Sequence, residues 1–120
     1  MQNDNDPRIK DNAGDDNDTS AITAVSFARD IAVLFTTKDK KCMSDFGVLL
    51  DDFNYMSNPA GDETYPDHAN ANHVYARLTG KEKPQMPMGE KYWTAPDNPQ
   101  GQQNLKTFDA WMNVAPAYQP

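Results

Sequence analysis

The chain has 120 residues, 18 of them acidic and 11 basic, with a formal net charge of −7. This length allows one domain, and the negative charge disfavours nucleic acid as a partner. The single cysteine, Cys42, excludes an internal disulfide framework, and no apolar stretch approaches the roughly 18 residues of a membrane span. The first residues show no signal peptide, so the localisation stays open, with the cytoplasm as the default.

Residues 1–20 form an acidic segment that contains six aspartates but only two basic residues, Arg8 and Lys10. Ile9 is the only large apolar residue in this segment besides Met1. Burial of so little apolar surface cannot offset the entropy cost of ordering the chain, about 1–2 kcal/mol per residue. We therefore expect a mobile acidic tail, followed by one domain over residues 21–120. A calcium loop over residues 11–18 is the weaker alternative, because an EF-hand also needs a distal glutamate and flanking helices.

The next two expected elements are short amphipathic helices. Ser26 is a potential N-cap for a first helix that ends near residue 35, with apolar residues at helical spacing: Phe27, Ile31, Leu34 and Phe35. Residues 38–43 read as a polar link with at most a helical turn. A second helix is expected from Ser44 until Asn58–Pro59 stops it, with one apolar face: Val48, Leu49, Phe53 and Met56.

A third helix is the clearest in the chain. Asp67 is its expected cap, Gly80 its end, and its apolar residues recur at helical spacing: Ala71, Val74, Tyr75 and Leu78. Residues 81–99 carry four prolines and predict a long loop, which is usually functional in a small domain. A last helix is expected over residues 102–114. The pattern predicts an all-α domain of about four short helices.

The order of these parts resembles a small class I cytochrome c domain. Residues 26–35 are similar to the segment before the haem attachment site, and Met86-Pro-Met-Gly89 after the third helix is similar to the loop that supplies an axial methionine. Residues 105–114 resemble the C-terminal helix that packs across the N-terminal one. The likeness spans residues 25–115 in short pieces, and an unrelated small helical domain is the alternative.

The motif for covalent haem attachment is missing from this chain. Two thioether bonds and a histidine ligand need Cys-x-x-Cys-His, whereas Lys38–Met43 holds one cysteine and no histidine. The segment is similar to the charged replacement in haem-less relatives of these domains. We expect large apolar side chains to fill the former haem space: Phe46, Leu49, Leu50, Phe53, Tyr55 and Met56.

The resemblance implies a non-enzymatic accessory domain that binds a protein partner, which could be an oxidoreductase, and no cofactor. Cytochrome c domains dock through the face around the haem edge, so the expected partner-binding residues lie in the long loop: Met86, Met88, Tyr92 and Trp93. Loop aromatics can equally close over the core, and for Trp93 this is the favoured role. Tyr118, beyond the last helix, either folds back or docks on a partner.

The alternative function is electron transfer by a metal- or haem-binding protein that uses Met86 with His68 or His73. The two histidines are five residues apart on one helix, about 140° around its axis, so joint chelation is not expected. Cys42 follows Lys40 and Lys41, which favour its thiolate, but no partner base is evident. We therefore predict no catalytic residues.

Overall fold

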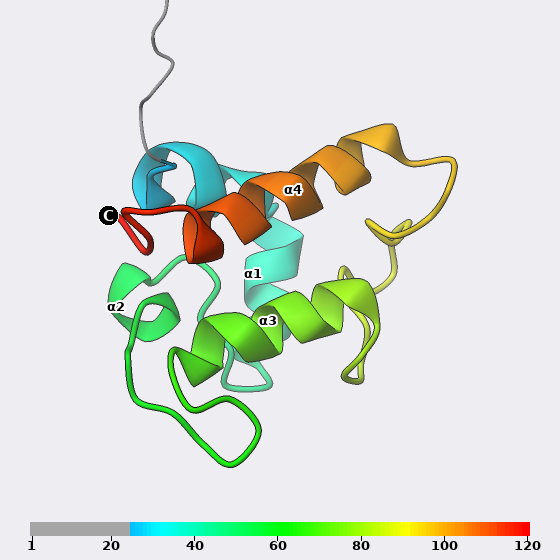
Figure 1. Ribbon diagram of the computed structural model, residues 1–120. Helices are drawn as coiled ribbons and strands as arrows, with labels where there is room; N and C mark the ends of the chain where they lie inside the picture. The colour runs from blue at the N-terminus through cyan, green and yellow to red at the C-terminus, as the bar shows by residue number, and fades with distance from the viewer. Residues whose placement is uncertain (1–24) are drawn as a thin grey trace, which may run out of the picture.

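The computed structural model describes residues 25–120, so the acidic tail and the calcium loop considered above lie outside the described residues. Within that part of the chain the regular elements are helical, apart from one isolated bridge between Ser26 and Gln119 (Figure 1). The elements are the π-helical turn η2 (Phe27–Ile31), the 3-10 turn η3 (Ala32–Leu34), α1 (Thr37–Ser44), α2 (Phe53–Met56), α3 (Ala69–Thr79) and α4 (Pro99–Asn113). The expected all-α fold class is confirmed.

The first helical segment begins as predicted, but it is not a regular α-helix. The Ser26 Oγ accepts a hydrogen bond from the Arg29 N–H at 3.4 Å, and Phe27 and Ile31 are buried. The N–H groups of Phe27 and Ala28 donate to the carbonyls of Gln119 and Pro120. The start of this segment is therefore held by the far end of the chain, a contact that local spacing does not encode.

The polar link expected at residues 38–43 is part of helix α1. Thr36 and Asp39 form a capping box at the N-terminus of this helix. The continuous helix expected from Ser44 to Met56 is wrong. Gly47 has φ +77°, and the Val48 N–H donates to the Met43 carbonyl, which forms a Schellman motif that ends α1. Helix α2 starts only at Phe53, where the Asp52 carboxylate accepts from the Tyr55 N–H.

Helix α3 agrees with the prediction except at its cap. Its N-cap is His68 in the left-handed conformation with φ 52°, and not Asp67. The Asn72 side chain instead donates to the backbone carbonyls of Asp67 and His68. Gly80 ends the helix with φ 87°, as its position predicts.

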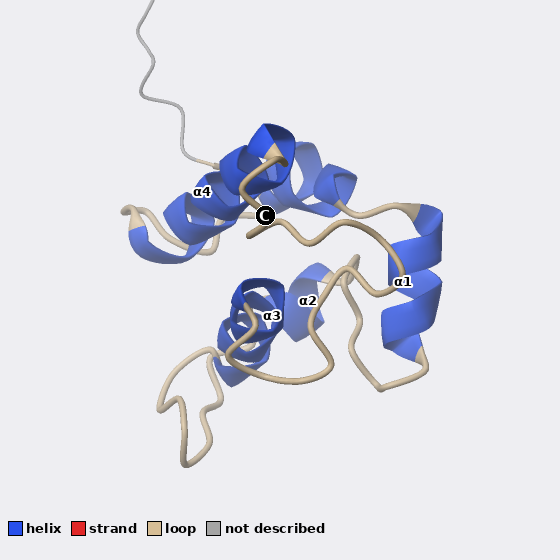
Figure 2. Ribbon diagram, turned by 90° about the vertical axis from the view of Figure 1, so that its right-hand side faces the viewer, coloured by secondary structure: helices blue, strands red, loops and turns tan. Residues whose placement is uncertain are grey.

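Helices α3 and α4 pack on each other, and η2 packs on α4, while α2 packs on α3 (Figures 1 and 2). Aromatic rings carry these contacts: Phe27 lies 5.4 Å from Trp111, and Tyr75 lies 5.9 Å from Phe108. The packed centre combines aromatic, aliphatic and methionine side chains from η2, the four α-helices and the connections between them. Its largest fully buried members are Trp111, Phe108, Ile31, Met43, Leu50, Met56, Leu78, Met86 and Val74.

The side chains expected to fill a former haem space divide into two groups. Leu50 and Met56 are buried, and Phe53 and Tyr55 pack at the edge of the core. Phe46 and Leu49 remain 54 % and 40 % exposed, so their predicted burial is wrong. The turn at Gly47 explains the difference, because it places these two side chains on the outside of the connection between α1 and α2.

The C-terminal segment folds back along η2 and α4. The Trp111 Nε1–H donates to the Gln119 carbonyl at 2.8 Å, and the Tyr118 N–H donates to the Trp111 carbonyl at 2.8 Å. The Ser26 hydroxyl donates to the Pro120 carbonyl. Of the two alternatives for Tyr118, the structure shows the side chain folded back on the body, 5.0 Å from Trp111.

Candidate functional site

The long loop between α3 and α4 buries two of the four residues expected to bind a partner. Met86 is 0 % exposed and belongs to the core. Trp93 is 6 % exposed and stacks on Phe35, with ring centroids 5.5 Å apart and planes at 17°. Both side chains therefore pack in the core of this chain, and for Trp93 this is the other role that the sequence allowed.

The other two expected partner-binding residues lie at or near the surface. Tyr92 is 42 % exposed, whereas Met88 packs partly against the core. The backbone beside Tyr92 is well anchored: its carbonyl accepts from the Asn98 side chain and from the Ala95 N–H, both at 3.1 Å. The loop therefore presents Tyr92 from a fixed backbone.

His68 and His73 lie on different sides of α3, as their spacing predicts. His68 stacks on Tyr118, with ring centroids 3.7 Å apart and planes at 6°. This contact joins the start of α3 to the C-terminal segment. His68 is thus engaged in packing between the two segments.

His73 is held between two carboxylates. Its Nε2 lies 2.5 Å from Asp62 Oδ2, its Nδ1 hydrogen-bonds to Glu82, and the ring of Tyr65 packs edge-on against it. Two acceptors can both be satisfied only by a doubly protonated imidazolium. Partial burial lowers the pKa of His73, but the hydrogen bonds to Asp62 and Glu82 outweigh it, so this pKa lies above its ordinary value.

Two of the candidate metal ligands, His73 and Met86, are already engaged in other contacts. Both ring nitrogens of His73 already have carboxylate partners, and the Met86 sulfur lies in the core. A metal at His73 would have to displace one of these partners. Across residues 25–120, no three histidine, cysteine or acidic side chains come together in a group suited to a metal ion.

We expect the His73 network to make stability depend on pH. A histidine whose folded pKa is raised stabilises the fold fully below its unfolded pKa of about 6.5, and this stabilisation is lost as the pH rises through the folded value. Denaturant titrations across this range should show the loss in the natural chain and not in His73→Gln. An NMR titration should give a His73 pKa above 6.5 that falls in Asp62→Asn, and a value below 6.5 would contradict the network.

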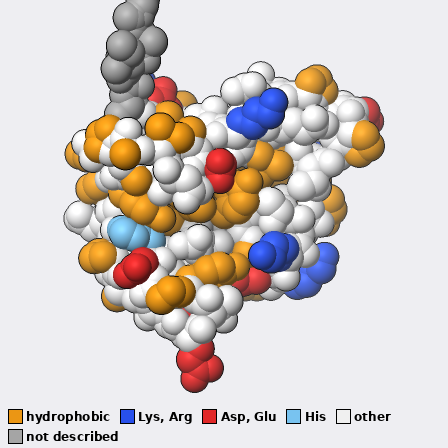
Figure 3. Space-filling view, in the orientation of Figure 1, with side chains coloured by type: hydrophobic (Ala, Val, Ile, Leu, Met, Phe, Trp, Pro, Cys, Tyr) orange, Lys and Arg blue, Asp and Glu red, His pale blue; other side chains and the backbone are white. Residues whose placement is uncertain are grey.

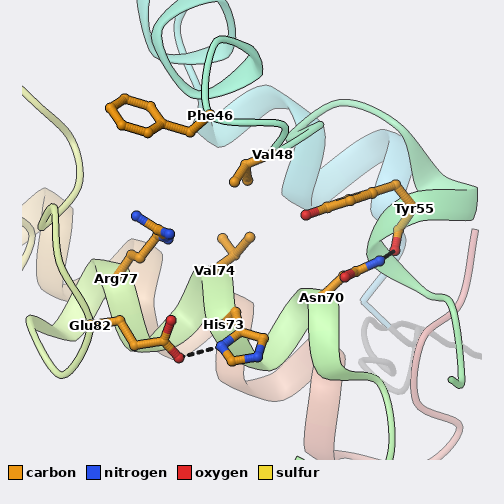
Figure 4. A pocket seen from close by; sticks show the side chains of 8 residues that line it. All are labelled: Phe46, Val48, Tyr55, Asn70, His73, Val74, Arg77 and Glu82. Atoms are coloured by element: carbon orange, nitrogen blue, oxygen red, sulfur yellow. Dashed lines mark hydrogen bonds and ion pairs between the residues drawn. The ribbon is translucent and has the colours of Figure 1, made fainter. Parts of the chain in front are cut away.

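A pocket of about 290 Å³ opens between α3 and the segment that runs from the end of α1 to α2 (Figure 4). Its apolar walls come from Phe46, Val48 and Val74. Its polar lining consists of Tyr55, Asn70, His73, Arg77 and Glu82. The pocket thus combines apolar contact area with a small set of polar groups, which is typical of small-molecule sites.

Of the candidate site residues expected from the sequence, His73 alone lines this pocket, and a further part of the lining can be read from the sequence. Asn70, His73 and Arg77 follow helical spacing, so they form a polar stripe on α3 beside Val74 of the buried stripe. Phe46, Val48 and Tyr55 come from a region expected to be one helix. Only the turn at Gly47 brings Phe46 and Val48 over this stripe.

Hydrophobic side chains also gather on the face between α4 and α3, with charged groups around them (Figure 3).

No helix in the described range 25–120 is both long enough and apolar enough to cross a bilayer. Comparisons with protein-family models, with curated proteins and with solved structures gave no match.

Proposed function

We propose that this chain is a non-enzymatic accessory domain that binds a protein partner through the surface around Tyr92. The observation that carries the proposal is that the Tyr92 side chain is exposed on a backbone that is held in place. Tyr92 is 42 % exposed, and the next residue, Trp93, is buried against Phe35. An aromatic side chain held in this way loses little conformational freedom on binding, and tyrosine is frequent among the residues that dominate binding energy.

The surroundings of Tyr92 support the same role. Lys91 and Asp97 form an exposed ion pair at 2.9 Å across the base of the loop, beside the contacts of Asn98 to the Tyr92 carbonyl. Met88, partly buried in the same loop, can add apolar contact area next to a docked partner. An exposed aromatic with a polar rim is the usual composition of a protein–protein interface.

We further propose that the scaffold is a haem-less cytochrome c-like domain and that its partner is an oxidoreductase. The order of helices, and the packing of the first helical segment on α4, support this resemblance. Cytochrome c domains dock on redox partners, so a derivative without haem can keep the docking face. This step is an analogy between folds, and the partner's identity is its test.

The alternative, an electron-transfer protein that binds a metal or haem, has less support. The chain lacks Cys-x-x-Cys-His, the Met86 thioether is enclosed by the core, and His73 is shared by two carboxylates. His68 is stacked on Tyr118. The donor groups named for that function do not fit a haem iron.

Site-specific cross-linking tests the partner proposal. A photoreactive phenylalanine analogue replaces Tyr92 in the full chain, and matched chains carry it at the exposed positions Val33 or Val114. In extracts of the native host we expect one partner to be captured from position 92 and not from the control positions. The captured protein is then purified, and its affinity for the natural chain and for Tyr92→Ala is measured.

An interface centred on Tyr92 predicts that Tyr92→Ala weakens binding by at least about tenfold with an unchanged melting temperature, since a central aromatic is worth about 2 kcal/mol or more. Equal capture from all three positions, or unchanged affinity in Tyr92→Ala, would overturn the assignment. A captured partner without redox chemistry would leave the interaction domain standing and refute the oxidoreductase as its partner.

A further inference from the structure

The pocket beside α3 contains polar groups that the protein itself leaves unsatisfied. The Tyr55 hydroxyl points into the space between α3 and the segment above it (Figure 4), and no described residue hydrogen-bonds to this oxygen. The Arg77 guanidinium also lines the pocket, across Val48 and Val74 from the Tyr55 hydroxyl in this view (Figure 4), and it donates one hydrogen bond, from Nη1 to the Lys83 carbonyl at 3.1 Å. Its other N–H groups have no protein acceptor within residues 25–120. Both groups are open to water, so they can donate to a ligand that accepts hydrogen bonds.

The charges around the pocket indicate what charge a bound ligand can carry. No carboxylate within residues 25–120 forms an ion pair with Arg77. Glu82 also lines the pocket, but its carboxylate is bonded to His73, which Asp62 contacts on the other side. With His73 protonated, this group of three carries one net negative charge, and Arg77 neutralises it. Arg77 is therefore a lining cation without a carboxylate partner among residues 25–120, and a singly charged anion beside it meets less repulsion from Glu82 than a doubly charged phosphate does.

The pocket's size and walls define the rest of the ligand. A volume of about 290 Å³ lies at the lower end of small-molecule sites. Val74 forms its floor, and Phe46 and Val48 lie above it (Figure 4). Phe46 is 54 % exposed in the chain alone, so a ligand under its ring would bury apolar surface that now faces water.

We propose that this pocket binds a small monocarboxylate with an aromatic body. The carboxylate accepts hydrogen bonds from the Arg77 guanidinium and the Tyr55 hydroxyl, and the body lies among Phe46, Val48 and Val74. A planar guanidinium suits a carboxylate because it can donate two parallel hydrogen bonds. Partial burial also raises the pKa of Tyr55, which keeps its hydroxyl protonated as a donor. The site contains neither Tyr92 nor Met88, so it is independent of the partner-binding proposal.

Titration of the full chain with four probes at constant ionic strength tests this proposal by NMR chemical shifts. Benzoate carries both the charge and the aromatic body, benzamide removes the charge, acetate removes the body, and inorganic phosphate replaces the acid. We expect benzoate to shift the amide signals of Tyr55, Val74 and Arg77 with a Kd of about 1 mM, as its size allows. Benzamide, acetate and phosphate should each bind at least about tenfold more weakly. Equal binding of benzamide or phosphate would overturn the proposal.

Variants show which groups hold the carboxylate. We expect Arg77→Gln to weaken benzoate binding by at least about tenfold and Tyr55→Phe by about threefold to tenfold, the range for charged and neutral hydrogen bonds. Lys106→Gln, which removes a cation from the exposed face of α4, should leave binding unchanged. If Arg77→Gln fails to fold, Tyr55→Phe and the benzoate–benzamide comparison decide the question. Unchanged affinity in Tyr55→Phe, together with unchanged affinity in a folded Arg77→Gln, would refute the site.

Discussion

Replacing Trp93 by alanine is expected to lower the free energy of unfolding by about 3–5 kcal/mol, as for other buried large aromatics. The side chain is 6 % exposed, and its ring stacks on Phe35. The backbone of Trp93 also lies close to α4, because a Cβ at Gly101 would come within 2.6 Å of the Trp93 Cα. Loss of the ring therefore leaves a cavity where the long loop meets α4. Urea denaturation of the natural chain and the variant measures the effect.

Tyr92→Ala is the matched control for Trp93→Ala, because the two aromatic residues are adjacent and differ in burial. We expect it to change stability by less than about 1 kcal/mol, as for a surface substitution. The pair separates two roles within one loop, since Trp93 holds the loop and Tyr92 is available to a partner. A Trp93→Ala variant with natural stability would show that its ring does not belong to the core.

The second large effect is expected at Trp111, where alanine should also cost about 3–5 kcal/mol. Trp111 is 1 % exposed and contacts Phe27, Phe108 and Tyr118, with ring centroids 5.0–5.8 Å away. It joins the first helical segment, α4 and the C-terminal segment. A loss of this size is a large part of the 5–15 kcal/mol by which most domains are stable. Thermal and urea denaturation of Trp111→Ala measure it.

Trp111→Phe separates ring packing from the hydrogen bond of the indole. The variant keeps an aromatic ring but loses the Nε1–H that donates to the Gln119 carbonyl at 2.8 Å. That carbonyl retains the Phe27 N–H as a donor at 2.9 Å, so no buried acceptor is left unpaired. We expect a smaller loss, about 1–3 kcal/mol. A loss equal to that of Trp111→Ala would mean that the retained ring contributes nothing, and that the hydrogen bond and the extra volume of the indole account for the whole effect.

Local sequence signals determined most of the helices. The spacing of apolar residues located α3 and α4, and Ser26 and Gly80 marked a start and an end that the structure confirms. These signals act within one or two turns, where caps and apolar stripes depend on neighbouring residues alone. The missing Cys-x-x-Cys-His is likewise a property of the sequence by itself, and it rules out haem attached through two thioethers.

Two local signals were present but were outweighed in the prediction by apolar spacing. Gly47 after α1 and Asp52 before α2 mark an end and a start, yet the apolar residues around them fit one longer helix. The turn at Gly47 directs Phe46 and Leu49 outward and leaves Leu50 in the core. One residue in the left-handed region therefore decides which of these side chains can line a pocket.

Only the tertiary structure decided which loop aromatics are buried and where polar groups converge. Tyr92 and Trp93 are adjacent and both aromatic. Their roles differ because Trp93 packs against Phe35 and lies close to Gly101, whereas Tyr92 remains exposed. In the same way, Asp62 and Glu82 meet at His73 from two loops. Such contacts join residues far apart in the chain, and their energies depend on burial, which local propensity does not contain.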